Sequence, residues 1–193
     1  GAGSAHAREA GGAALRAMTF AERGALLRKT ADVLAANRAR YAEIATVNCG
    51  NTAVDAAIDI DGGVGTLKVY ARLGEKLGAA RMLIEPGSEQ LAKENVFRAA
   101  HVWTTRPGVA IHINAFNFPA WGLWEKAAVA LLAGVPVVAK PASPTAWLAH
   151  EMARDVIAAT VLPAGAPSPL CGSADGLLDC VGPMDGIAFT GSA

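Results

Sequence analysis

Apolar residues recur with a helical period through much of the first half of the chain. Thr19 and Glu22 form a T-x-x-E capping box, which marks the start of a helix at Phe20. Behind the box, apolar residues recur at helical spacing at Leu26, Leu27, Ala31, Leu34, Tyr41 and Ile44. The pattern predicts one helix from about Phe20 to Thr46, ended by the turn-forming string NCGNT at residues 48–52.

A second helical stretch is predicted from Ala53 to Leu77. Gly62, Gly63 and Gly65 weaken its middle, because glycine loses more backbone freedom in a helix than other residues do. A polar loop that contains Gly and Pro follows at residues 85–90.

From Asn95 onward, β-branched and aromatic residues replace the helical pattern. The run NVFRAAHVWTTRPGVAIHINAF predicts one strand, a turn at residues 106–108 and a second strand that starts near Val109.

Strands and helices then alternate to the last residues. Pro119 opens a helix that ends at Gly134, VPVVAK is a short buried strand, and a helix over residues 143–160 has Ser143 as its N-cap and Pro144 in its first position. LPAGAPSPLCG returns to the sheet, SADGLLDCV is a short helix, and GIAFTGS is a further strand. This alternation predicts an α/β fold with a doubly wound parallel sheet and helices on both faces. Pro169 is unexpected in an interior strand, because proline cannot donate to the ladder.

Polar residues gather at the carboxyl ends of the predicted strands, where doubly wound sheets bind their ligands. They fall at residues 114–117, 140–143, 171–173 and 190–192. Lys140 follows an apolar strand, at a position where the hydroxyls or phosphates of a cofactor would lie. Asn117 is restrained by Phe118 and Pro119, so its amide could donate to an oxyanion or cap the next helix. The spacing leaves both roles open.

Composition excludes several classes of function. The chain has 193 residues, with 17 basic and 17 acidic side chains, which argues against a nucleic-acid partner. The longest apolar run, residues 127–139, contains Gly134 and Pro136 and is shorter than the roughly 20 residues that a membrane span needs. The odd number of cysteines, without a CxxC pair, indicates a reducing cytoplasm. No metal site is expected, since HEMAR at residues 150–154 lacks a second His.

Four strings together resemble the aldehyde dehydrogenase superfamily. They are INAFNFP (113–119), KPAS (140–143), LPAG…LCGS (162–173) and FTGS (189–192). With DIDGG and the W…EK spacing, they look like the branch that oxidises semialdehydes carried on coenzyme A thioesters in aerobic phenylacetate or benzoate breakdown. The resemblance implies N-terminal helices (1–80), an oligomerisation hairpin (95–108) and the first half of a Rossmann-like sheet (109–193), truncated.

The resemblance also implies chemistry and site residues. A Cys thiolate would attack the aldehyde, Asn117 would hold the oxyanion, and a Glu would activate water; that Cys and Glu would lie beyond FTGS, leaving this chain inactive alone. The residues that would bind NADP, or NAD, are Ile113, Asn114, Ala115, Phe116, Lys140, Ala142, Ser143, Gly172, Thr190, Gly191 and Ser192.

Ser143 stands where NAD-preferring relatives often carry a Glu, so the resemblance favours NADP. A homo-oligomer, a dimer or higher, is expected. Two alternatives stay open: an aldehyde dehydrogenase without a coenzyme A substrate, and a catalytically inactive nucleotide-binding or assembly protein.

Overall fold

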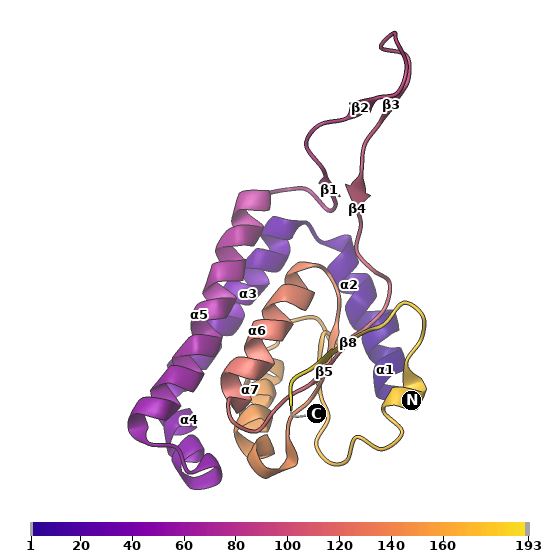
Figure 1. Cartoon of the computed structure of the whole chain (residues 1–193). Coiled ribbons are helices and arrows are strands. Elements are labelled where there is room, and N and C mark those ends of the chain that lie inside the picture. The colour runs from indigo at the N-terminus through magenta and orange to yellow at the C-terminus, as the bar shows by residue number, and fades with distance from the viewer. Residues whose placement is uncertain (1, 192–193) are drawn as a thin grey trace.

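The computed structural model describes residues 2–191 and begins with a layer of helices (Figure 1). Their bounds are α1 (Ala2–His6), the π-helix η1 (Ala7–Gly11), α2 (Gly12–Ala17), α3 (Phe20–Ala36), α4 (Arg38–Ile44), the π-helix η2 (Ala45–Cys49) and α5 (Ala53–Leu77). The capping box is confirmed, since the Glu22 amide donates to Thr19 Oγ1 at 3.2 Å. The predicted helix over 20–46 is interrupted at Asn37, which has φ −100° and ψ 8° and donates its side-chain amide to the Val33 carbonyl.

Helix α5 is continuous over its predicted bounds despite its glycines. A Cβ at Gly62 would lie 2.5 Å from the Trp121 ring, and one at Gly63 would lie 3.2 Å from the Ala120 carbonyl. These glycines let the next helix approach the α5 backbone, and that packing offsets their weak helix propensity.

A thin hairpin projects from the helical body (Figure 1). Its strands are β1 (Leu83–Ile84), β2 (Glu89–Gln90), β3 (Arg98–Ala99) and β4 (Val102–Trp103). β1 pairs antiparallel with β4 and β2 with β3. The prediction of a plain loop at residues 85–90 was wrong, because β2 lies within it; polar, exposed residues gave no alternating pattern there.

Four parallel strands form the main sheet: β5 (Ala110–Ile113), β6 (Val137–Lys140), β7 (Pro167–Pro169) and β8 (Gly186–Phe189). Their spatial order is β7-β6-β5-β8. The chain builds outward from β5 through β6 to β7 and then returns to place β8 on the other side of β5. The strand order therefore reverses between β5 and β8, as the doubly wound class requires.

Asp185 fixes β8 beside β5. Its buried carboxylate accepts hydrogen bonds from the Val109 and Gly182 amides, each at 2.8 Å, and from Arg8 at 2.7 Å. These donors hold the pKa of Asp185 below its ordinary value against the opposing effect of burial.

Helices cover both faces of the sheet. α6 (Pro119–Leu132) and α7 (Ala146–Ala158) pack on the face that carries Val137 and Ala139, with α3 and α5 behind them. The opposite face forms a smaller cluster with the N-terminal helices and a later turn: Ala7, Val109, Ile111, Val138 and Leu177. No helix in the described residues is both long and apolar enough to span a bilayer.

Arg23 ties the helical layer together from within. It is 1% exposed, and its guanidinium donates to the carbonyls of Leu132, Leu15 and Met18 at 2.7, 3.1 and 2.8 Å. Burial lowers its pKa. A planar group with several fixed donors can join the ends of α2 and α6 to α3 in this way.

Three local expectations were wrong. Ser143 is not a helix N-cap: a 3₁₀ turn, η3 (Ser143–Thr145), precedes α7, and its hydroxyl caps neither element. The short helix predicted from SADGLLDCV is only the 3₁₀ turn η4 (Leu178–Cys180). Within residues 2–191, Pro169 lies in an edge strand, because β7 pairs there with β6 alone, and Leu170 supplies the amide that bonds to Ala139.

Candidate functional site

An open groove of about 630 Å³ lies at the carboxyl ends of β5, β6 and β8. We call it the strand-end groove. Its lining comes from three separate segments: Asn114, Ala115, Phe116, Asn117, Lys140, Ala142, Phe189, Thr190 and Gly191. It lies at the reversal of strand order, where the C-terminal edge of a doubly wound sheet offers a crevice.

Lys140 brings a positive charge to this groove. It is the last residue of β6 and only 8% exposed. Its Nζ donates to the Pro141 carbonyl at 3.0 Å and to Ser143 Oγ at 3.4 Å. Both acceptors are neutral, so they orient the ammonium without cancelling its charge. An ammonium held this way can bind hydroxyls or phosphates of a ligand.

Asn114 joins the end of β5 to its neighbours. Its backbone amide donates to the Lys140 carbonyl at 3.0 Å, and its Oδ1 accepts from Lys126 Nζ at 2.7 Å. Its Nδ2 is buried without a protein partner. Asn114 lines the groove, while this donor atom itself is covered by protein.

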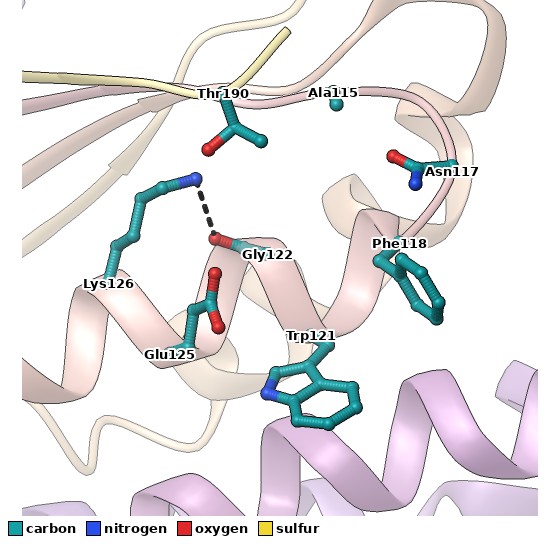
Figure 2. Close-up of a pocket in the computed structure, with 8 residues that line it drawn as sticks. All are labelled: Ala115, Asn117, Phe118, Trp121, Gly122, Glu125, Lys126 and Thr190. Carbon is teal, nitrogen blue, oxygen red and sulfur yellow. Dashed lines mark hydrogen bonds between the residues drawn. The ribbon is translucent and has the colours of Figure 1, made fainter.

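Asn117 faces a second, smaller space on the α6 side of the groove. This side cavity, of about 260 Å³, shares Ala115, Asn117 and Thr190 with the strand-end groove. Figure 2 shows the Asn117 amide directed from the turn before α6 toward this space, with Lys126 and Glu125 on its far side. Asn117 therefore lies where the two spaces meet.

Asn117 does not cap helix α6. The N-cap residue is Phe118, whose side chain makes no capping bond. The first free helix amides are instead bound by Asp59 of α5: Ala120 donates to Oδ2 at 3.1 Å and Trp121 to Oδ1 at 2.7 Å. The cap alternative for Asn117 is therefore wrong, and its amide remains available to a ligand.

His112 is buried in β5, and Lys126 of α6 lines the side cavity. Burial and the Lys126 charge lower the pKa of His112 to about 4, so its ring is neutral near pH 7. Burial also lowers the pKa of Lys126. The sequence reasoning assigned no site role to Lys126 or Asp59. The usable signals were a lysine within the apolar helix WEKAAVALLAG and an aspartate on the apolar face of α5.

Ile113, Ser143 and Gly172 do not line the groove. Ile113 belongs to β5 and accepts a hydrogen bond from the Thr190 amide at 2.9 Å. Ser143 reaches the groove only through its bond to Lys140. Gly172, with φ +116°, is exposed and does not line the groove. Ser192 lies outside the described residues.

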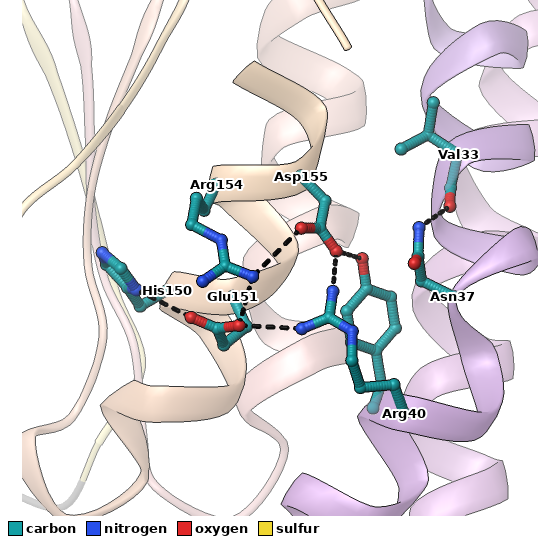
Figure 3. Close-up of polar contacts among 8 residues, drawn as sticks. Val33, Asn37, Arg40, His150, Glu151, Arg154 and Asp155 are labelled. Atoms are coloured by element: carbon teal, nitrogen blue, oxygen red, sulfur yellow. Dashed lines mark hydrogen bonds and ion pairs between the residues drawn. The ribbon is translucent and has the colours of Figure 1, made fainter. Parts of the chain in front are cut away.

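A separate polar cluster joins α4 to α7 (Figure 3). Arg40 bonds Glu151 at 2.8 Å and also pairs with Asp155, which accepts from the Tyr41 hydroxyl at 2.6 Å. Burial and the bond to Asp155 raise the pKa of Tyr41. None of these residues lines the groove, so the cluster is a link between helices.

Comparison with known proteins gives a consistent match. The family model described as "Aldehyde dehydrogenase family" matches residues 2–193. The chain is 57% identical over 187 residues to 3,4-dehydroadipyl-CoA semialdehyde dehydrogenase of Aromatoleum evansii, covering 97% of this chain and 36% of that protein.

Solved structures agree with this match. The chain resembles the NAD-dependent benzaldehyde dehydrogenase of Corynebacterium glutamicum with a TM-score of 0.79 and 29% identity, over 99% of this chain and 41% of that one. It resembles an NADP-dependent enzyme of E. coli with a TM-score of 0.71 and 30% identity, over 84% of this chain and 32% of that one. The chain thus spans 36% of the length of the Aromatoleum evansii relative.

Proposed function

The chain belongs to the aldehyde dehydrogenase family, and from that premise we propose that it supplies the dinucleotide groove and oxyanion donor of an enzyme that oxidises an aldehyde to a carboxylic acid. The observation that carries the proposal is the position of Asn117. Its side-chain amide does not cap α6 and lies where the strand-end groove meets the side cavity. A neutral amide donor at such a junction can stabilise negative charge that develops on a carbonyl oxygen.

The residues of the strand-end groove fit NAD(P)⁺. The Lys140 ammonium lies at the groove wall and is oriented by neutral acceptors. Lys140 would bind the ribose hydroxyls, Asn114 and Phe116 would line the path of the chain of phosphates, and Thr190 and Gly191 would form the opposite wall. When bound, NAD(P)⁺ would accept the two electrons that leave the aldehyde carbon.

Asn117 and the side cavity would act on the aldehyde. The cavity lies between α6 and the ends of β5 and β8, so an aldehyde carbonyl there would be next to the Asn117 amide. Asn117 would donate a hydrogen bond to the carbonyl oxygen, more strongly as that oxygen becomes negative. The nucleophilic Cys and the base Glu would come from chain beyond the FTGS string.

The proposed substrate is a semialdehyde carried on a coenzyme A thioester, from aerobic phenylacetate or benzoate breakdown. The 57% identity to a relative named for such a substrate supports this choice. We further propose NADP as the preferred cofactor, because Ser143 stands where NAD-preferring relatives often carry a Glu. The cytoplasm is the proposed compartment, because the sequence has an odd number of cysteines and no CxxC pair.

The test is an assay of the full-length enzyme with NADP⁺ and matched aldehydes, read by reduced-dinucleotide absorbance. We expect faster turnover with a coenzyme A-linked semialdehyde than with a free aldehyde of the same chain length. Equal rates would favour an aldehyde dehydrogenase without a coenzyme A substrate. A protein that binds dinucleotide but oxidises neither aldehyde would overturn the proposal in favour of an inactive nucleotide-binding protein.

A further inference from the structure

The first turn of α6 is held by a side chain from a distant part of the chain. Pro119 at the start of α6 has no amide hydrogen, and the next two amides have no intrahelical acceptor. Asp59 satisfies both, with one carboxylate oxygen for each. Two bonds to one rigid carboxylate fix the helix start in position and in direction.

Asp59 is itself fully buried. It is 0% exposed and lies in the long helix α5, on the face that α6 packs against. One turn further along α5 the two helices approach closely: a Cβ at Gly62 would clash with the Trp121 ring, and one at Gly63 would crowd the Ala120 carbonyl. A shift of the α6 start would therefore break both hydrogen bonds and the contact between the helices.

The segment from Asn117 to Trp121 is continuous with this anchor. Phe118 and Trp121 meet edge to face, with ring centroids 6.1 Å apart and an interplanar angle of 85°. Asn117 directly precedes this pair, so its backbone position follows that of the first turn of α6. Figure 2 shows Asn117, Phe118 and Trp121 along one side of the side cavity.

We propose that Asp59 is a positioning residue for Asn117: its carboxylate, bonded to the Ala120 and Trp121 amides, sets where the Asn117 amide donor lies. This inference rests on the proposed function for Asn117. An oxyanion donor must lie within about 0.5 Å of its productive position, and a displacement of about 1 Å can lower a rate by 10²-fold. A loosened helix start would produce such a displacement.

The test is a double-mutant cycle in the full-length enzyme, with Asp59→Asn in wild type and in Asn117→Ala. Asn in place of Asp59 turns one acceptor into a donor facing an amide hydrogen. We expect kcat to fall by about 10- to 100-fold in the Asn117 background and to fall no further in Asn117→Ala, because residues that act as a unit are not additive. The Kd for the dinucleotide should stay within about twofold of wild type.

The matched control is Asp61→Asn, which removes an exposed carboxylate of the same helix that pairs with Arg38 at 2.7 Å. It should leave kcat unchanged in both backgrounds. If Asp59→Asn does not fold, Asp59→Glu keeps the charge while pushing the α6 start outward, and the same cycle is measured on it.

A crystal structure of the Asp59 variant separates this proposal from the proposed function. We expect Asn117 to move by about 1 Å or more relative to α5. If Asn117 remains within about 0.5 Å of its wild-type position, or if kcat falls equally in both backgrounds, the positioning role is wrong. Wild-type enzyme that oxidises no aldehyde would refute the proposed function, while the displacement of Asn117 would still decide the role of Asp59.

Discussion

The net charge of the pair formed by Lys140 and Ser143 depends on which side chain stands at position 143. Ser143 accepts a hydrogen bond from Lys140 at 3.4 Å and adds no charge of its own. A negative side chain in its place would meet a 2′-phosphate with repulsion, and would accept from a 2′-hydroxyl instead. The preference between the two dinucleotides is therefore expected to lie in this residue.

Ser143→Glu should turn the proposed NADP preference toward NAD. We expect NADP⁺ to bind at least about tenfold more weakly, equivalent to 1.4 kcal/mol, with NAD⁺ binding retained or improved. Titration of each dinucleotide into full-length wild-type and variant enzyme measures this. Ser143→Ala is the control for loss of the hydroxyl alone. A wild-type enzyme that prefers NAD⁺ would contradict the prediction at once.

Thr160 is a strained position just beyond α7. With φ +50° it is the one non-glycine residue with a positive φ in the described part of the chain. A β-branched side chain in the left-handed region is costly, so Thr160→Gly should stabilise the protein by about 1 kcal/mol. The midpoint of thermal unfolding measures the change. Thr160→Ala keeps the Cβ and should give little gain; equal gains from both variants would show that the strain is not the cause.

Some residues of the candidate site could be predicted from the sequence, and others could not. The residues at the ends of β5, β6 and β8 were predicted because a parallel sheet brings its carboxyl ends to one edge. Asp59 was not, because its partners Ala120 and Trp121 are more than 60 residues away, as the separations of 61 and 62 show. No local pattern encodes a helix cap that comes from another helix.

At the scale of elements, α6 is fixed at both ends by buried side chains. Asp59 binds its first amides, and Arg23 binds the Leu132 carbonyl at its last residue. Between these anchors, Lys126 reaches from α6 to Asn114 at the end of β5. The helix that follows Asn117 is therefore tied to α5, to the N-terminal helices and to the sheet.

His112, on the strand β5 beneath α6, makes the fold sensitive to acid. Its pKa is about 4 when folded and about 6.5 when unfolded, so the unfolded chain binds more protons below pH 6.5. The stability is fully present above about pH 6.5 and is lost as the pH falls toward 4, by on the order of 3 kcal/mol. Wild type should therefore lose more stability than His112→Leu between pH 7 and pH 4.

Urea unfolding at both pH values measures this difference. His6→Leu is the matched control, since it removes an exposed imidazole at the end of α1. If His112→Leu loses as much stability in acid as wild type, the buried neutral ring is not the cause.

The predicted elements held where packing and local pattern agreed. α5 matched its predicted bounds, and β5, β6 and β8 followed their apolar runs. β1 and β2, which form the first arm of the hairpin, were not predicted. They are short and exposed, and they pair with β4 and β3. Cross-strand pairing is a contact between distant residues and leaves no alternation in an exposed arm.

At the scale of the whole molecule, the hairpin carries a group of exposed apolar residues. Isolated two-stranded hairpins are marginally stable in water, so this one is expected to be covered by another copy of the chain in a homo-oligomer. The exposed apolar residues on it are Leu83, Ile84, Leu91, Val96, Phe97, Val102 and Trp103. We propose this surface as the oligomer contact.

Phe97→Ser with Trp103→Ser should lower the oligomeric state of the full-length enzyme. The two side chains are 59% and 64% exposed, so their loss should not disturb the monomer core. Sedimentation velocity measures the change. Val47→Ser, which removes an exposed apolar side chain far from the hairpin, should leave the oligomer intact. An unchanged oligomer in the hairpin double variant would place the contact elsewhere.

The central claim is that Asn117 is the oxyanion donor of a dinucleotide-dependent aldehyde oxidation, and kcat of Asn117→Ala in the full-length enzyme tests it most directly. Asn37→Ala, which removes an amide between α3 and α4, is the control. We predict that Asn117→Ala lowers kcat by about 10²–10³-fold with dinucleotide Kd and thermal stability unchanged. A kcat within about threefold of wild type, far less than removal of one such donor costs, would contradict the claim.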